Sequence, residues 1–174
     1  MSKRISNHAR RLNGYIIPTA HEIWTASVLS MQRNPSHGID LLDNLEAPRV
    51  GVEVKFILTS PILPESDYPS AWTTQNHQVD YNDGITCHWA LGQYQLDRLV
   101  KDIKAQTPEE FESHVAKREL WLVAWDWMNQ YPPSTVKYGN IFRYPKKSNL
   151  PETVRTIEVE KGLIHLTKGV SLTI

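Results

Sequence analysis

The sequence predicts a mixed α/β domain in which helices pack on a small sheet. Three segments carry this prediction: an amphipathic pattern over residues 19–32, an alternating pattern over 50–58 and a continuous apolar run over 120–125. Helical spacing, strand alternation and burial of a strand on both faces are the usual causes of such patterns. The full element order is helix, two strands, a long loop, a strand, a helix and a strand, which is typical of this class.

The first helix is expected to run from Thr19 to about Gln32. Thr19 can cap its N-terminus, and Glu22 falls in the first turn, where an acidic side chain interacts favourably with the helix dipole. Its apolar face comprises Ile23, Ala26, Val28 and Leu29. The helix is expected to end before residues 34–38, which read Asn-Pro-Ser-His-Gly.

Two strands are expected next. Residues 39–42 form a short one, residues 43–49 a turn, and residues 50–58 the clearest strand in the chain. In the latter, β-branched and apolar residues alternate with Glu53 and Lys55, which therefore share one face. The following segment, 59–84, is rich in Pro, Asp and Asn, and loops of this length are usually functional or mobile.

The second half of the chain predicts further strands around one helix. Residues 85–91 and 120–125 read as strands, and residues 93–105 as a helix with apolar residues on one side. Residues 154–160 and 163–167 are expected to pair as a hairpin that turns at 161–162. Trp121, Trp125 and Trp127 are spaced by four and two residues, so they are expected to share one face of the buried strand. We expect them to pack in the core rather than to stack on nucleic-acid bases.

Length and composition indicate one soluble, cytoplasmic domain. The chain has 174 residues, 40% of them hydrophobic and 22% charged, which excludes wholesale disorder. Neither a membrane span nor a secretory signal is apparent, and Cys87 is the single cysteine, which excludes an internal disulfide framework. We expect a single domain over 1–174, with a core over about 19–127 and a β-rich C-terminal extension over 134–174.

The charges are segregated although the net charge is zero. Residues 1–11 carry +4, residues 134–174 carry +4 and the middle of the chain carries −8. Zero net charge disfavours a polyanion partner. Basic ends around an acidic middle would, however, suit a protein that grips phosphates and holds a cation. Chance asymmetry is the alternative interpretation.

Four residues form the strongest candidate site: Glu22, Asp40, Glu53 and Lys55. Glu53 and Lys55 lie about 7 Å apart on one strand face, and Asp40 reaches the same face if its strand is adjacent. Two converging carboxylates are unfavourable without a neutralising cation, and a hard divalent ion such as Mg²⁺ suits their oxygens. The ammonium group could orient an attacking water while the metal stabilises charge on a phosphoryl group.

This pattern resembles the PD-(D/E)XK nuclease superfamily, whose restriction endonuclease-like core has the order αβββαβ. The resemblance covers about residues 19–125 and rests on an acid on the first helix, an Asp opening a strand and Glu53-Val54-Lys55 on the next. It implies that Asp40, Glu53 and the Val54 carbonyl bind Mg²⁺, for which Mn²⁺ can substitute. It further implies that Lys55 acts on the water and that Glu22 holds an outer-shell water or a second ion.

Several alternatives stay open at this point. Ile39 stands where the family name has Pro, and Asp43 could replace Asp40 as the metal ligand. Some family branches carry a Gln on the helix after the (D/E)-x-K strand, for which Gln93 or Gln95 could serve. Asp102-Ile103-Lys104 matches the same short motif by chance. If the whole pattern is structural, Glu53 and Lys55 form a surface pair worth under about 1 kcal/mol.

The resemblance predicts a type II restriction-like, Mg²⁺-dependent endonuclease that cuts DNA, acts as a homodimer and does not bind membranes. The alternatives are a Holliday junction resolvase or another structure-selective or RNA-directed nuclease, and a non-catalytic binding or assembly protein. Double-stranded or branched DNA is the expected partner. Polar loops and the basic terminal segment supply the candidate nucleic-acid contacts: His37, Trp72, Gln75, Asn76, Gln93, Lys146 and Lys147.

Overall fold

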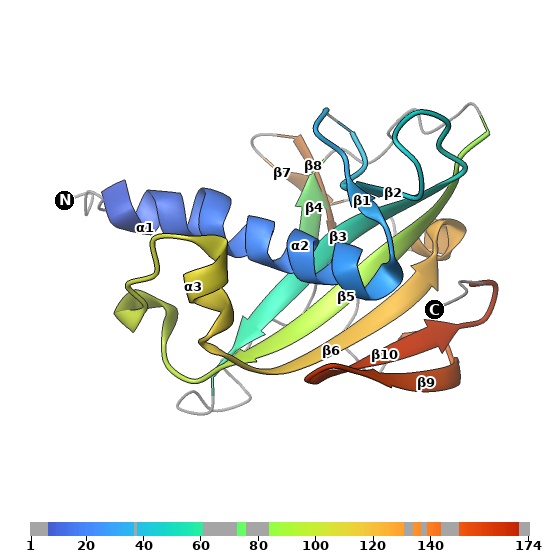
Figure 1. The fold of residues 1–174 in the computed structure, drawn as a ribbon. Helices are drawn as coiled ribbons and strands as arrows, with labels where there is room; N and C mark the ends of the chain where they lie inside the picture. Colours follow the sequence, from blue (N-terminus) through green and yellow to red (C-terminus); the bar gives the residue numbers. More distant parts are fainter. Residues whose placement is uncertain are drawn as a thin grey trace.

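The computed structural model describes residues 7–36, 38–60, 73–75, 84–130, 134–136, 139–143 and 150–170. Their fold is mixed α/β, with a seven-stranded sheet at its centre and few helices (Figure 1). The predicted fold class is therefore confirmed at this level. None of the described helices is long and apolar enough to cross a membrane.

The central sheet has the strand order β1-β2-β3-β5-β6-β10-β9. Its strands β1, β2 and β3 pair antiparallel in chain order, β5 is parallel to β3, and β6 is antiparallel to β5. Beyond β6, β10 pairs parallel with it and β9 closes the edge. The strand bounds are Gln32–Arg33 (β1), Leu41–Leu42 (β2), Val50–Thr59 (β3), Thr86–Leu96 (β5), Val115–Ala124 (β6), Thr153–Val159 (β9) and Gly162–Thr167 (β10).

The predicted strands at 50–58 and 120–125 are confirmed as β3 and the second half of β6, except that Trp125 already belongs to the following 3-10 helix. In β6, residues 118–123 are buried without interruption, because the strand lies inside the sheet and is covered on both faces. The predicted hairpin is confirmed as β9 and β10, with Lys161 in a left-handed turn conformation. This hairpin belongs to the same sheet as β3.

The N-terminal helix is longer than expected. It comprises α1 (Asn7–Arg11), a π-helical turn (Leu12–Ile16) and α2 (Ile17–Leu29), where Ser30 ends it in a left-handed conformation. Thr19 lies buried inside α2, so the prediction that it caps the helix is wrong. Pro18 lacks the backbone N–H that an α-helix needs at this point, and a π-helical turn next to it is a common adjustment.

The predicted helix over 93–105 is wrong. Residues up to Leu96 continue β5, and only Val100–Asp102 form a 3-10 turn before α3 (Pro108–Glu112), which Thr107 caps. The apolar spacing of 96–103 mimics a helix. The strand forms because β5 pairs with β3 and β6 along its whole length. The hydrogen bonds and side-chain packing of these ladders are long-range interactions, which the local sequence pattern does not reveal.

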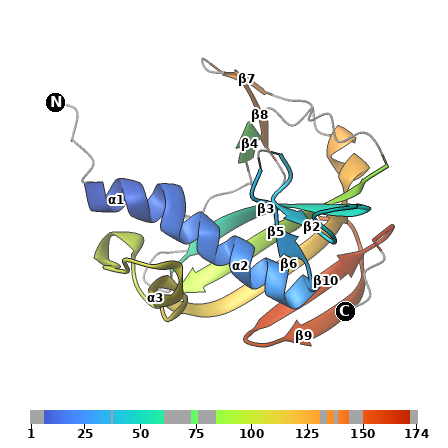
Figure 2. The same cartoon turned by 45° about the horizontal axis from the view of Figure 1, so that its top comes forward.

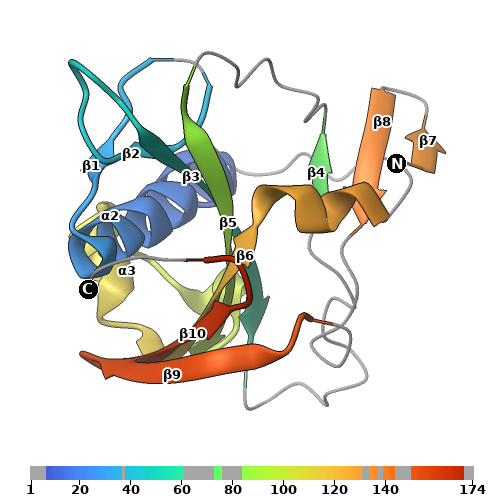
Figure 3. The same ribbon diagram turned by 90° about the vertical axis from the view of Figure 1, so that its right-hand side faces the viewer.

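The two faces of the sheet are covered differently (Figures 2 and 3). The helical segments α1, Leu12–Ile16 and α2 follow one another as one continuous helix, here called the helix rod. The helix rod packs on one face, where α2 residues meet Val52, Val54 and Phe56. On the other face, Trp121 packs with Trp89 and with Trp125 and Trp127. The core role of the three tryptophans is confirmed, but Trp125 and Trp127 lie in the 3-10 helix η4 (Trp125–Gln130), not on the strand.

A second sheet of three short antiparallel strands lies on the side of the central sheet away from α2 (Figures 1 and 3). It has the order β4-β8-β7, formed by Thr73–Gln75, Gly139–Arg143 and Ser134–Val136. The segment 59–84, expected to be irregular, thus contributes one described strand. Part of the expected C-terminal extension lies in this second sheet, and part lies in the central one.

Gly92→Ala is expected to destabilise the fold by about 1–3 kcal/mol, because a Cβ at this position would overlap the fully buried Tyr94 ring. Gly14→Ala is the matched control. No atom lies within 4 Å of its new Cβ, and alanine favours helix by up to about 1 kcal/mol over glycine. Urea unfolding measures both changes, and a Gly92→Ala protein as stable as the wild type would contradict the packing.

Candidate active site

Asp40 directly precedes β2, and Glu53 lies on the neighbouring strand β3. Leu41 pairs with Val52 in the antiparallel β2–β3 ladder, and this register continued by one position brings Asp40 opposite Glu53. Side chains of opposite residues share a face, and this face is the one turned away from α2, since Leu41 and Val52 pack in the core below the helix. The Val54 N–H donates a hydrogen bond of 2.8 Å to Asp40 Oδ2, which fixes the carboxylate against β3.

Lys55 stands on the same face of β3, two residues beyond Glu53. Its ammonium Nζ lies 2.6 Å from Glu53 Oε1, within a short ion pair. The Glu53 side chain is only 4% exposed and that of Lys55 is 21% exposed. The low exposure of Glu53 excludes the alternative interpretation, in which the two residues form a solvated surface pair. A buried carboxylate is costly without a cationic partner, and Lys55 supplies that partner.

The electrostatics of Asp40 indicate crowding of negative charge. Burial raises the pKa of Asp40 to about 7, and the neighbouring Glu53 carboxylate acts in the same direction. Lys55 and the Val54 N–H act against this rise without cancelling it. A carboxyl group with a pKa near neutrality marks a place where a second negative charge is poorly tolerated. A bound cation would remove that penalty.

Glu22 approaches this group from the helix. It lies in the middle of α2 rather than in the first turn, and Arg33 of β1 holds it through bonds of 2.7 and 3.0 Å to one carboxylate oxygen. Its charge still contributes to the raised pKa of Asp40, as the smallest of the contributions. Glu22 therefore sits at the periphery of the Asp40–Glu53 pair, with its own cationic partner.

Asp43, the alternative metal ligand, has a different task. Its Oδ1 accepts backbone hydrogen bonds of 2.9 Å from Arg49 and Val50, which closes the connection between β2 and β3. Its side chain is exposed, outside the crowded face. Asp40 is the carboxylate that the strand register places opposite Glu53.

The donor set fits a hard divalent cation. Asp40 and Glu53 offer oxygen ligands, and Mg²⁺ usually takes one or two carboxylates and keeps several waters. Within the described part of the chain, no cluster of three or more His, Cys, Asp and Glu residues is placed to hold a metal ion. A site here would thus depend on these two carboxylates, with a backbone carbonyl such as that of Val54 and with water completing the shell.

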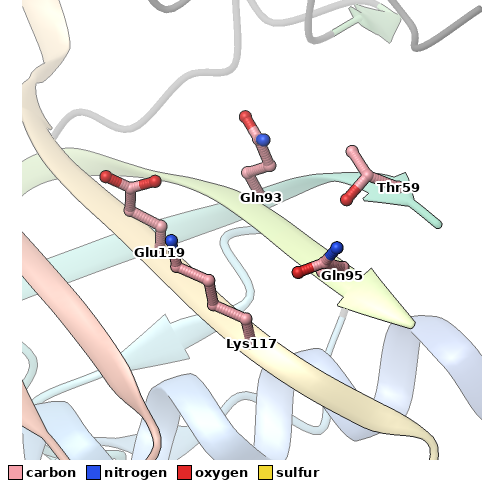
Figure 4. A pocket seen from close by; sticks show the side chains of 5 residues that line it. All are labelled: Thr59, Gln93, Gln95, Lys117 and Glu119. Carbon is pink, nitrogen blue, oxygen red and sulfur yellow. The ribbon is translucent and has the colours of Figure 1, made fainter. Parts of the chain in front are cut away.

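The candidate nucleic-acid contacts are only partly within the described residues. His37, Trp72, Asn76, Lys146 and Lys147 lie outside them, and Gln75 is described only as part of the β4 backbone. Gln93 is on strand β5, so the expectation that it or Gln95 sits on a helix is wrong. It lines a cavity instead, together with Thr59, Gln95, Lys117 and Glu119 (Figure 4).

Thr59, Lys117 and Glu119, which also line this cavity, were not predicted from the sequence. A signal existed: Gln93 and Gln95 are polar residues two apart, as are Lys117 and Glu119, which is the spacing of one strand face. The erroneous helix over 93–105 hid it, because on a helix positions 93 and 95 point in different directions.

We expect Asp40→Asn to stabilise the metal-free protein at pH 8 by on the order of 2 kcal/mol and to change little at pH 4. The pKa of Asp40 is about 7 in the folded state and 3.8 ordinarily. The contribution of this carboxyl group to stability is therefore fully present below pH 4 and is lost as the pH rises through 7. The substitution removes that loss. Urea unfolding across this pH range measures it.

Asp43→Asn is the control, since it removes a charge that backbone N–H groups stabilise and should lower stability at pH 8. Equal effects of the two substitutions at pH 8 would contradict the crowding at Asp40.

A scan against protein-family models found no match to this chain, and searches of curated proteins and of solved structures also returned none. The function therefore has to be inferred from the arrangement of the residues described above.

Proposed function

We propose that this protein is a Mg²⁺-dependent endonuclease of the PD-(D/E)XK type that hydrolyses DNA phosphodiester bonds. The observation that supports it most is the convergence of Asp40, Glu53 and Lys55 on one face of β2 and β3, with the Asp40 pKa raised by burial and by Glu53. A structural ion pair does not need a second carboxylate beside it, whereas a metal-dependent hydrolase does.

The element order adds support. The helix α2 is followed by three antiparallel strands, as in the αβββ part of a restriction endonuclease-like core. Strand β5 then pairs parallel to β3. The first strand, β1, is only two residues long, because seven residues separate Gln32 from Asp40. The family's next helix would fall between β3 and β5, where only β4 is described beyond Ser60.

In the proposed mechanism the site residues have different roles. Asp40 and Glu53 would hold Mg²⁺, with the Val54 carbonyl as the ligand that the resemblance adds. When bound, the ion stabilises the negative charge that develops on the phosphoryl oxygens. Lys55 orients the attacking water with its ammonium group and supports the same charge. Glu22, held by Arg33, binds water at the rim or a second ion.

We also propose how the substrate is engaged. A type II restriction-like enzyme with one small catalytic core needs two copies to cut both strands of a duplex, so a homodimer on double-stranded DNA is the first expectation. The basic segments 1–11 and 134–174 are proposed as phosphate or dimer contacts. A Holliday junction resolvase or an RNA-directed nuclease on the same core is the alternative. A non-catalytic binding protein is the rival outside this class.

Plasmid cleavage in Mg²⁺ tests the proposal. The wild type should nick or cut DNA, EDTA should stop it, and Lys55→Ala should lower kcat by about 100-fold or more, as loss of a positioned proton-handling group does. Lys104→Ala, in the chance Asp102-Ile103-Lys104 motif, removes an exposed lysine outside the site and should retain activity. If plasmid, branched DNA and RNA all remain intact, the nuclease proposal is contradicted and the non-catalytic binding protein is favoured.

Metal binding is a separate prediction. At pH 8, Mg²⁺ or Mn²⁺ at about 100 times its Kd should stabilise the wild type by about 2.7 kcal/mol. The stabilisation should weaken below pH 7, because the Asp40 proton then competes with the ion. Asp40→Asn and Glu53→Gln should remove it, whereas Asp43→Asn should keep it. Thermal unfolding with and without metal measures these shifts, and a response unaffected by the Asp40 and Glu53 substitutions would place the ion elsewhere.

A further inference from the structure

A second polar area lies on the same sheet face as the candidate active site. The five residues Thr59, Gln93, Gln95, Lys117 and Glu119 line a cavity of about 130 Å³ (Figure 4). Strand register brings them together: Gln93 is opposite Glu119, and Gln95 is opposite both Thr59 and Lys117. Since side chains at opposed positions share a face, all five project from β3, β5 and β6 toward one side.

The polar character of this area contrasts with its surroundings. On the same face, the preceding rows of β5 and β6 hold the fully buried Trp89, Leu91 and Val123. At the cavity, Gln93 and Gln95 are half-buried, and Thr59 and Glu119 are buried. The two buried groups are bonded within the protein, Thr59 to the Tyr94 carbonyl and Glu119 to His165. A concentration of polar side chains around one cavity, on three adjacent strands of an otherwise apolar face, is typical of a ligand site.

Glu119 is held in place from the far side of the cavity. His165 Nε2 lies 2.9 Å from Glu119 Oε1, and His165 Nδ1 lies 3.0 Å from Thr156 Oγ1. Because an ionised carboxylate only accepts hydrogen bonds, Nε2–H donates to Glu119. The His165 ring is further stacked on Trp121, with 4.9 Å between the ring centroids. This chain from β9 through β10 to β6 orients the Glu119 carboxylate.

The donors and acceptors of the cavity match a nucleobase better than a bare phosphate. Two glutamine amides each offer a donor and an acceptor, the pairing used for base edges. Glu119 accepts from exocyclic amino groups, and Lys117 donates to carbonyl or ring-nitrogen acceptors. A phosphate would be repelled by Glu119, whereas a base presents both donors and acceptors.

Geometry further selects an unpaired base. A base in an intact duplex is stacked, and its edge is reached only by an element that enters a groove. A recess in the face of a sheet does not enter a groove, so the base must leave the stack to occupy it. Strand spacing places Gln93 about 14 Å from Glu53, four residues along and one strand across. That is about four nucleotides at the 3.4 Å rise of a duplex strand.

We propose that this cavity binds an unpaired nucleobase of the DNA substrate, within about four nucleotides of the bond that is cut. The distance to the bond that is cut rests on the proposed nuclease function. The base-binding cavity itself makes DNA with a single-stranded region, rather than intact duplex, the preferred substrate class. Gln93, Gln95 and Glu119 contact the base edge, and Lys117 contacts the base or its flanking phosphate.

Fluorescence anisotropy tests the proposal without requiring cleavage. The full chain carrying Lys55→Ala, which prevents cutting, is titrated in Mg²⁺ onto a labelled duplex and onto the same duplex with a central single-stranded gap. We expect the gapped DNA to bind more tightly. Gln93→Ala and Lys117→Ala should each weaken its binding about tenfold while changing duplex binding less than twofold.

Two controls separate the site from general effects. Lys101→Ala removes an exposed positive charge away from the cavity and should affect both DNAs equally. Gln93→Glu nearly conserves side-chain size and, by placing a second carboxylate opposite Glu119, should also weaken gapped-DNA binding. Thermal unfolding checks that each variant is folded, and Lys117→Ala, at an exposed position, provides a test that does not disturb the core.

The outcomes distinguish this inference from the proposed function. Equal binding of gapped and intact DNA, or cavity variants that behave like Lys101→Ala, would overturn the base-binding site even if Mg²⁺-dependent cleavage is observed. If the variants bind DNA as expected but the wild type cuts no nucleic acid, the base-binding role of the cavity is supported and the nuclease function is overturned. No binding to either DNA would overturn both.

Discussion

The pairing of β2 with β3 is the constraint on which the candidate site depends. It sets Asp40 opposite Glu53, on the face away from the helix, and the alternation of β3 adds Lys55 to the same face. The Val54 N–H then bonds the Asp40 side chain, so the carboxylate is anchored to the strand that carries its neighbour. A shift of the register by one residue would turn Asp40 toward the core and disperse the group.

Burial gives this arrangement its chemical character. Glu53 lies opposite Trp89, whose ring stacks on Trp125 of η4, and the Glu53 side chain is only 4% exposed. Asp40 then carries a proton up to about neutral pH, and above it the ionised carboxylate lowers the stability of the fold unless a cation neutralises it. Stability and proposed activity are thus in opposition at one residue, as is common where function needs converging charges.

The long strands β5 and β6 extend the same face beyond this pair. They carry the buried Trp89 and Trp121 and, farther along, the polar residues of the Gln93–Glu119 cavity. One sheet face therefore holds a charged edge, an apolar middle and a polar end. The helix rod occupies the opposite face, and η4 and the small sheet lie on the side that carries these groups (Figure 3).

Local sequence determined what depends on backbone periodicity alone. The strand at Val50–Thr59, the shared face of Glu53 and Lys55, and the turn at Lys161 were all predictable, because alternation and turn chemistry act over a few residues. Only the tertiary structure placed Asp40, rather than Asp43, against β3 beside Glu53, formed a strand instead of a helix over 93–96, and set Gln93 opposite Glu119. Those outcomes arise from strand register and burial, which are set by residues distant in the chain.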